Sequence, residues 1–282
     1  MTSDREAAPG ERDCQATGSM GAHSAPLAWV HGYTMSSAIW AEAWGLMPER
    51  AHIGIDLPGH GRHAGEAMPR ELSAWADHVA EGMRAAGARE LVGLSFGSAV
   101  ALQVAADHPD LVDRLVLAAP TLCGVPDDRE ARAKYFLLML RMREHGPGRA
   151  LARVWMTDPP PIFRGLRAHP QRYAAMEDVV AEHPFAELRN GAMSRISATV
   201  QGPDLLARVR CPILLVVGTD DMPQFRENTE VIARHTAGAR VATFDGLGHL
   251  PLLEAPEACL PAVRDFLAQP AAARPILAAA SR

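Results

Sequence analysis

Residues 90–102, Glu-Leu-Val-Gly-Leu-Ser-Phe-Gly-Ser-Ala-Val-Ala-Leu, decide how this chain folds. A short apolar run meets the turn Gly93–Gly97 and continues into small helix-forming residues, which predicts a strand turning sharply into a helix. The two glycines remove side chains that would collide across so tight a turn. Ser95 at the vertex is then pushed clear of the sheet, at a helix start whose free N–H groups favour a negatively charged oxygen. The stretch predicts a nucleophilic serine.

This Gly-x-Ser-x-Gly pentapeptide is weak support by itself, because a glycine-rich turn can also cradle a phosphate or close a loop. Its position strengthens it: an apolar strand pattern precedes it, a helical pattern follows it, and the chain has no second copy. A serine nucleophile also needs a general base and an acid. The rest of the chain must supply both.

The composition is that of a folded α/β protein. Of 282 residues, 48% are hydrophobic and 22% are charged, which suffices for one α/β domain with an insertion and excludes a disordered or fibrous chain. The net charge is −5 without a basic stripe, so nothing favours nucleic-acid binding. Lys134 is the only lysine, and the abundance of Arg and Ala indicates a GC-rich, bacterial source.

Cysteine usage and the chain ends predict a cytoplasmic protein. The four cysteines, which form no Cys-x-x-Cys motif, are expected to be buried thiols: Cys14, Cys123, Cys211 and Cys259. Residues 1–25 are polar and lack the apolar core of a signal peptide, and no apolar run approaches transmembrane length. We expect loose tails at residues 1–25 and 269–282.

Strand and helix patterns alternate along the chain. Strands are expected at residues 27–30, 52–57, 90–94, 114–120, 212–218 and 240–244. Helical patterns fill the gaps, at residues 72–87, up to Pro109 after the elbow, 224–235, and in a last helix reaching Leu267. This alternation predicts an α/β fold with a mostly parallel, doubly wound sheet covered by helices on both faces.

A gap of about ninety residues between the strands at 114–120 and 212–218 requires an inserted domain. Its helical patterns lie at residues 135–142, 150–156, 173–181 and 186–200. The core is therefore expected at residues 26–120 and 208–268, and a helical cap at 121–207. A cap rich in Met and aromatic residues above a reactive serine favours a bulky apolar substrate. We expect a mobile cap in which trimming Trp155 or Met139 changes the preference for acyl size.

The base and the acid are expected beyond the carboxyl ends of the strands, where reacting groups gather in open parallel sheets. Asp220 and Asp221 follow the strand that ends at Gly218. His249 follows the last strand, and flanking glycines let its loop present the imidazole. The chain order is then Ser95, aspartate, His249.

That order, with helices inserted before the acid, resembles the α/β-hydrolase superfamily over residues 26–268. The motifs that carry the resemblance are His31-Gly32-Tyr33, the turn Asp56-Leu57-Pro58-Gly59-His60-Gly61, the elbow at 93–97, and Gly248-His249 followed by Glu254-Ala255-Pro256-Glu257. Within the superfamily the chain is similar to capped bacterial esterases, enol-lactonases and C–C-bond hydrolases. Two features depart from the pattern: residues 11–26 give little support for the family's first two strands, and Pro261 falls inside the expected last helix. A proline there costs about 3 kcal/mol unless the helix starts or kinks at it.

The resemblance implies acyl transfer through Ser95, with His249 as the base and an aspartate orienting its ring. The family's acid usually lies three residues beyond the glycine ending the strand, which selects Asp221 over Asp220. Backbone N–H groups of Tyr33 and Phe96 would bind the oxyanion. This chemistry requires no metal and no organic cofactor.

Other side chains are assigned from their position alone. The substrate pocket is expected to include His31, Met35, Met139, Trp155 and Leu250. His31 and His60 are also expected to be structural turn or loop residues, and no acidic or cysteine partner makes His60 and His63 a metal pair. The remaining histidines, among them His52 and His183, are expected at the surface or at helix ends.

Three functions remain open. The first is hydrolysis of a carboxylic ester or lactone of a bulky apolar small molecule. The second is cleavage of a C–C bond beside a ketone, in a dienol or diketone substrate. The third is ligand binding or a rearrangement that does not use the triad, against which the intact Ser, Asp and His set argues. In each case the partner is a small molecule, without nucleic acid or membrane, and the protein is a monomer or homodimer.

Overall fold

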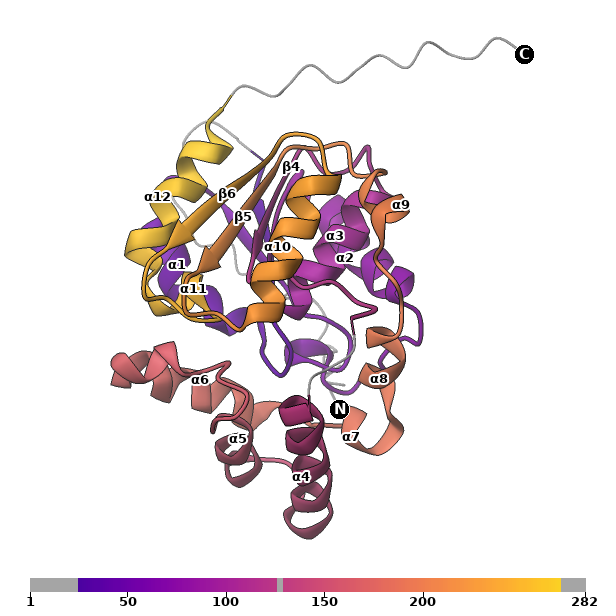
Figure 1. Cartoon of the computed structure of the whole chain (residues 1–282), viewed down its shortest axis with the longest axis vertical. Helices are drawn as coiled ribbons and strands as arrows, with labels where there is room; N and C mark the ends of the chain where they lie inside the picture. Colours follow the sequence, from indigo (N-terminus) through magenta and orange to yellow (C-terminus); the bar gives the residue numbers. More distant parts are fainter. Residues whose placement is uncertain (1–24, 126–128, 270–282) are drawn as a thin grey trace, which may run out of the picture.

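The computed structural model describes residues 25–125 and 129–269 and shows an α/β fold (Figure 1). Its sheet has the strand order β2-β1-β3-β4-β5-β6, with every neighbouring pair parallel. The strands are β1 (Leu27–Val30), β2 (His52–Ile55), β3 (Glu90–Leu94), β4 (Arg114–Ala118), β5 (Ile213–Gly218) and β6 (Ala239–Phe244). The predicted doubly wound parallel sheet is confirmed. The expectations for residues 11–24 and for most of both tails lie outside the described residues.

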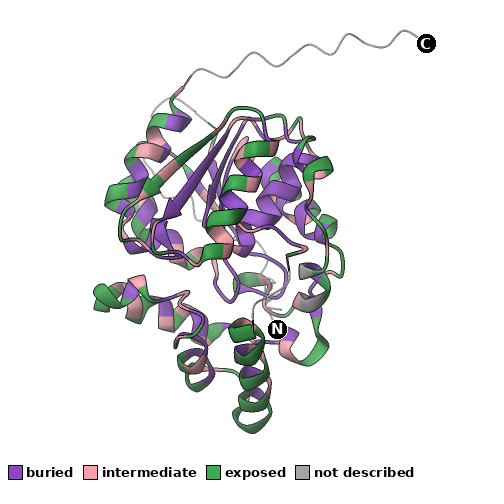
Figure 2. Cartoon of the chain, in the orientation of Figure 1, coloured by how far each residue is buried: buried purple, intermediate pink, exposed green. Residues whose placement is uncertain are grey.

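The middle of the sheet is buried on both faces. All residues of β1, β4 and β5 are buried, and these strands are nearly continuous apolar runs, as expected of parallel strands covered on both sides (Figure 2). β6 lies at the edge and leaves Val241 half exposed. Packing on both faces of the sheet therefore fixes the positions of the carboxyl ends of the central strands.

Helices cover the two faces of the sheet. α1 (Ala41–Leu46) and α12 (Pro256–Leu267) pack together on one face, and α2 (Leu72–Ala86), α3 (Phe96–Asp107) and α10 (Pro223–His235) lie on the other (Figure 1). α3 follows the elbow and is buried from Phe96 to Ala106. α12 begins at Pro256, a position where proline is tolerated, and continues through Pro261. The helix thus neither starts at Pro261 nor ends there.

Most of residues 121–207, here called the helical insertion, lie beyond the carboxyl ends of the strands, but the last helix of this range lies beside α3 and α10 (Figure 1). They form α4 (Arg129–His145), α5 (Arg149–Trp155), the 3-10 turn η3 (Gly165–Ala168), α6 (Pro170–Glu182), α7 (Glu187–Asn190), α8 (Ala192–Ser197) and α9 (Pro203–Leu206). The single helical segment expected at 186–200 is wrong. Gly191 adopts a left-handed conformation with φ of 65°, which ends α7 before α8 begins.

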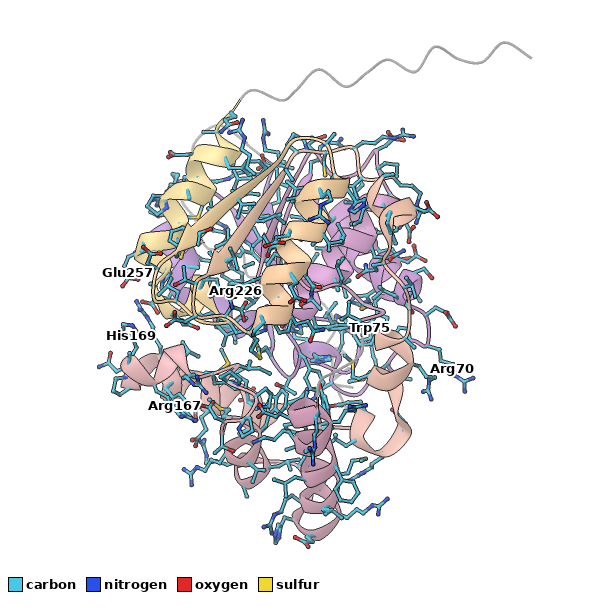
Figure 3. The ribbon with its side chains drawn as sticks, in the orientation of Figure 1. Arg70, Trp75, Arg167, His169, Arg226 and Glu257 are labelled. Atoms are coloured by element: carbon cyan, nitrogen blue, oxygen red, sulfur yellow. The ribbon has the colours of Figure 1, made fainter. Side chains whose placement is uncertain are left out.

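Arg172 on α6 joins the insertion to the core. Its guanidinium donates to the carboxylates of Glu42 on α1 and Glu257 on α12, and to the carbonyl of Glu254. Figure 3 shows Glu257 and His169 on the two sides of this junction. Among the helices of the described ranges, none is long and apolar enough to cross a membrane.

Candidate active site

The strand-to-helix turn places Ser95 in a strained conformation at the end of β3. Its φ is 53° and its ψ is −124°, outside the regions that most residues adopt. A Cβ at Gly93 would lie 2.5 Å from the carbonyl oxygen of Gly97, and a Cβ at Gly97 would lie 2.3 Å from the carbonyl oxygen of His31. The backbones approach so closely that only glycine fits at either position. This packing of the surrounding backbone stabilises the strained conformation of Ser95.

Ser95, His249 and Asp221 form a continuous chain of hydrogen bonds. Ser95 Oγ lies 2.9 Å from His249 Nε2, and His249 Nδ1 lies 2.9 Å from Asp221 Oδ1. With Nδ1–H donating to the carboxylate, Nε2 is left to accept the proton of the serine hydroxyl. Asp221 and His249 are buried, whereas Ser95 is partly exposed. The geometry is that of an acyl-transfer triad.

The structure distinguishes the two adjacent aspartates. Asp221 also accepts a hydrogen bond from the N–H of Met222 at 2.7 Å, which fixes its carboxylate toward the imidazole. Asp220 is exposed and contacts the hydroxyl of Thr219 instead. The ring of Phe225 packs on the imidazole with 4.3 Å between ring centroids. His249 is therefore held from its Asp221 side and from one face.

Glu254 holds the loop that carries His249. One carboxylate oxygen accepts the N–H of Gly248 at 2.6 Å, and the other accepts the N–H of Leu250 at 2.9 Å. Glu254 is almost fully buried, and a Cβ at Gly165 of the insertion would lie 2.0 Å from it. Glu254 was predicted to belong to a family motif, but without a role. The feature of the sequence that could have indicated its role is a carboxylate five positions after His249.

The loop after β1, residues 31–35, runs beside the nucleophile and is here called the oxyanion loop. A Cβ at Gly32 would lie 3.4 Å from the Cβ of Ser95. Tyr33 follows Gly32, and Phe96 follows Ser95 as the first residue of α3. The two residues expected to supply oxyanion N–H groups thus lie on the two segments that flank the serine.

His31 holds the oxyanion loop to the core. Its Nδ1 lies 2.8 Å from the carbonyl of Gly32, and its Nε2 accepts the N–H of Leu57 at 3.0 Å. Burial lowers the pKa of His31 to about 4, against the opposing charge of Asp56. Asp56 in turn accepts the N–H of Ser37 at 2.6 Å. Both ring nitrogens of His31 are thus engaged by protein groups.

A buried polar cluster joins the oxyanion loop to the insertion; we define it as Tyr33, His60, His183 and Glu187. The phenol of Tyr33 donates to Glu187, and His183 Nε2 lies 3.2 and 3.3 Å from the two carboxylate oxygens of Glu187. The rings of His60 and His183 have centroids 4.5 Å apart. Glu187 was not predicted. Its spacing of four residues from His183 is not that of a pair on one helix, because α6 ends at Glu182 and α7 begins at Glu187.

One histidine assignment is corrected. His183 lies at the end of α6, one of the two places expected for it, and is 3% exposed within this cluster. His52, expected at the surface or a helix end, is instead the first residue of β2 and 2% exposed; it accepts the indole N–H of Trp29 at 3.0 Å and lies 2.9 Å from the carbonyl of Met47. The partners of His52 are a side chain 23 residues away and a backbone carbonyl, so no local pattern reveals them.

The cluster has defined charges at neutral pH. Burial, aided by the charges of His183 and His31, holds the pKa of His60 well below its usual value. Burial alone would raise the pKa of the Glu187 carboxyl, but hydrogen bonds from His183 and Tyr33 and the charge of His183 hold it below its usual value. Burial and the nearby Glu187 charge raise the pKa of Tyr33 well above its usual value. Glu187 is thus an anion beside a neutral phenol and a neutral His60.

We expect the protein to lose stability in mild acid. Below pH 6.5 the unfolded chain protonates His31 and His60, whereas the folded protein keeps His31 neutral down to about pH 4 and His60 neutral as well. The free energy of unfolding should then fall with falling pH by about 1.4 kcal/mol per pH unit for each histidine. Urea unfolding at pH 7, 6 and 5 measures this slope.

The matched variants are His60→Gln and His145→Gln. His60→Gln should flatten the slope by about 1.4 kcal/mol per pH unit, since one of the two buried titrating groups is gone. His145 has an exposed side chain, so its replacement should leave the slope unchanged. A wild-type unfolding free energy that stays constant from pH 7 to 5 would contradict the neutral, buried state of these rings.

The other expected pocket residues lie on the oxyanion loop, beside His249 and in the insertion. Met35 and Leu250 are buried beside Gly32 and His249, Trp155 is buried in the insertion, and Met139 on α4 is partly exposed. An apolar cavity of about 170 Å³ opens between the insertion and the core. It is lined by Ala38, Ile39, Ala41, Glu42, Ala43, Leu166, Arg172, Ala175, Met176, Val179, Leu252, Leu253 and Pro256.

The described ranges contain no group of three or more His, Cys, Asp or Glu side chains arranged to hold a metal ion. His63, considered above beside His60, contacts Glu66 at 2.6 Å. His60 instead lies in the buried polar cluster.

Comparison with known proteins places the chain in a family. Residues 27–262 match the model of the alpha/beta hydrolase family, and the chain belongs to that family, as predicted. A pimeloyl-[acyl-carrier protein] methyl ester esterase of Aromatoleum aromaticum is 28% identical, over 86% of this chain and 97% of the relative.

Solved structures show the same fold. A thermophilic esterase from Thermogutta terrifontis is 25% identical and superposes with a TM-score of 0.69, covering 90% of this chain and 91% of that one. The enol-lactonase from Burkholderia xenovorans LB400 is 21% identical, with a TM-score of 0.67, covering 88% of this chain and 93% of that one.

Proposed function

We propose that this protein is a serine hydrolase that cleaves a carboxylic ester or lactone through an acyl-enzyme. The observation that carries the proposal is the hydrogen-bonded chain from Ser95 through His249 to Asp221, set on a strained strand-to-helix turn. Related proteins named as esterases and an enol-lactonase support ester bonds as the target. We assign the three residues the roles of nucleophile, base and acid.

The reaction follows from this geometry in two steps. His249 Nε2 takes the proton of Ser95 as Oγ attacks the carbonyl carbon, and the resulting oxyanion accepts hydrogen bonds from the N–H groups of Tyr33 and Phe96. The protonated imidazole, stabilised by Asp221, returns the proton to the departing alkoxide. Water then repeats the sequence on the acyl-enzyme, which releases the acid and restores the serine hydroxyl.

A bulky apolar acyl group is the substrate part we propose. The apolar cavity lies between the segment that follows the oxyanion loop and α11 (Pro251–Glu254), which begins two residues after His249. Its walls are mostly alanine, leucine and methionine side chains. One relative is named for the methyl ester of pimeloyl-[acyl-carrier protein], which supports testing methyl esters first.

The insertion acts as the cap in this proposal, covering the site and selecting the acyl group. Most of it lies over the carboxyl ends of the strands, and it contributes Leu166 and Met176 to the cavity. We further propose a cytoplasmic enzyme, monomeric or dimeric, that meets its small-molecule substrate without nucleic acid or membrane. Gel filtration with light scattering would test the assembly state.

A fluorophosphonate probe with intact-mass detection tests the function without knowledge of the substrate. Wild-type protein should gain one phosphonyl adduct, and peptide mapping should place it on Ser95. The Ser95→Ala variant should gain none. An unlabelled wild-type protein, or an adduct on another residue, would overturn the assignment of Ser95 as an activated nucleophile.

We expect Met139→Ala to change acyl-size preference by about tenfold, the scale at which a pocket discriminates small apolar groups. Comparing kcat/KM for p-nitrophenyl acetate, hexanoate and decanoate gives the ranking. Leu140→Ala is the control, because Leu140 is on the same helix but 40% exposed. Equal losses on all three esters, in step with a lower Tm, would mean that α4 is scaffold rather than a selector.

A further inference from the structure

Two consecutive residues of the oxyanion loop are hydrogen-bonded to the insertion. The phenol of Tyr33 donates to Glu187 on α7. The indole Nε1–H of Trp155, the last residue of α5, donates to the hydroxyl of Thr34 at 2.8 Å. The loop that passes beside Ser95 is thus attached to the insertion by neighbouring side chains.

Thr34 needs such support. Its φ is 62°, in the left-handed region that a β-branched residue rarely adopts and that costs about 1–3 kcal/mol. Its hydroxyl accepts the Trp155 hydrogen bond and donates to the carbonyl of Tyr33 at 2.7 Å. A strained residue of this kind persists only where its surroundings over-determine it. Trp155 is part of those surroundings.

Glu187 couples to Tyr33 through its buried charge. The carboxylate is 4% exposed and receives its hydrogen bonds from Tyr33 and His183. Removing one donor from a buried carboxylate costs more than the bond itself, because the charge loses part of its compensation. The ring of Tyr33 is also enclosed by Trp155, with 5.6 Å between centroids. Tyr33 therefore has one well-defined position while the insertion is packed against the core.

We propose that Glu187 and Trp155 are positioning residues that hold the backbone N–H of Tyr33 in line for the oxyanion, acting through Tyr33 and Thr34. The inference rests on the proposed function, which makes that N–H an oxyanion donor. In this arrangement the insertion does more than select the acyl group. Its seating completes the oxyanion hole, so the catalytic machinery is shared between core and insertion.

Kinetics on a small ester test the proposal, because p-nitrophenyl acetate requires no acyl pocket. Tyr33→Phe, Glu187→Gln and Trp155→Phe should each lower kcat by about tenfold or more, below the 100- to 1,000-fold loss of an entire oxyanion donor, with little change in KM. The Tyr33→Phe/Glu187→Gln double variant should lose about as much kcat as the more impaired single variant, since both substitutions act on the same contact between Tyr33 and Glu187. Affinity for a boronic acid that mimics the tetrahedral state should fall in parallel with kcat/KM.

Arg153→Met is the matched control. Arg153 lies on α5, two residues before Trp155, and its exposed guanidinium donates to Glu177 on α6, away from the oxyanion loop. The variant should leave kcat on acetate and boronic-acid affinity unchanged. Trp155→Phe keeps the test available if replacing Glu187 prevents folding, because it removes the hydrogen bond to Thr34 and leaves Glu187 in place.

Two outcomes distinguish a failure of this inference from a failure of the proposed function. If folded Tyr33→Phe, Glu187→Gln and Trp155→Phe keep wild-type kcat and boronic-acid affinity while only Tm falls, the contacts are structural and the inference is overturned. In that case Ser95 would still react with the fluorophosphonate. If wild-type Ser95 does not react with that probe, the proposed function itself fails, whatever the variants show.

Discussion

Replacing Ser95 with alanine should lower kcat for ester hydrolysis by about a million-fold, the scale of losing a triad nucleophile. The hydroxyl is the group that attacks the carbonyl, and His249 Nε2 at 2.9 Å has no other proton to accept in that step. The fold should survive, because Ser95 is only partly buried and its strained backbone is held by Gly93 and Gly97. Stopped-flow or end-point assays with p-nitrophenyl esters measure kcat, and thermal unfolding checks the fold.

Ser73→Ala provides the control for Ser95→Ala, since Ser73 is an exposed serine on α2. Its activity should equal that of the wild type. If Ser95→Ala kept activity near the wild-type level while folded, the triad would have no part in the reaction. The search for a nucleophile would then move to other residues around the cavity.

Asp221→Asn should lower kcat by about 10⁴-fold, as the same exchange does in an established triad. The asparagine amide can donate toward Nδ1, which favours the tautomer whose proton sits on Nε2, and that nitrogen can no longer accept from Ser95. Asp220→Asn should have little effect, because Asp220 is exposed and contacts Thr219. Comparing both variants at saturating substrate measures the difference.

A reversed ranking of the two aspartate variants would place the acid at Asp220. The loop would then have to be shifted by one residue, so that Asp220 took the place of Asp221. In the structure it is Asp221 whose Oδ1 lies 2.9 Å from His249 Nδ1. Equal, modest losses in both variants would mean that neither carboxylate orients the imidazole.

The fold could be predicted because its strands are local patterns. Residues 213–218 and 114–118 are apolar runs bounded by turn residues, and they form β5 and β4. The break at Gly191 could not be predicted, because helical periodicity continues through it while its backbone conformation ends the helix. One helical segment was therefore expected where the structure has two helices, α7 and α8.

Part of the site could also be predicted from the sequence, and part could not. The roles of Ser95 and His249 could be predicted from strand ends and glycine-flanked loops, whereas the choice of Asp221 over Asp220 needed the family resemblance. Glu187 and its contact with Tyr33 join positions 154 residues apart, so no window of sequence contains both. Charge compensation of a buried group depends on side chains that only the fold brings together, so the burial of Glu187 beside Tyr33 and His183 was not predicted.

Gly165 limits how this protein could be re-engineered. Even the methyl group of alanine at this position would lie 2.0 Å from Glu254, whose two oxygens hold the backbone on both sides of His249. A mutant library that varies the insertion to obtain new substrates can include Met139 or Leu166. Any replacement at Gly165, however, would displace the Glu254 carboxylate and with it the loop that carries the His249 imidazole. Variants at that position would be discarded for lost turnover even when their pocket suited the new substrate.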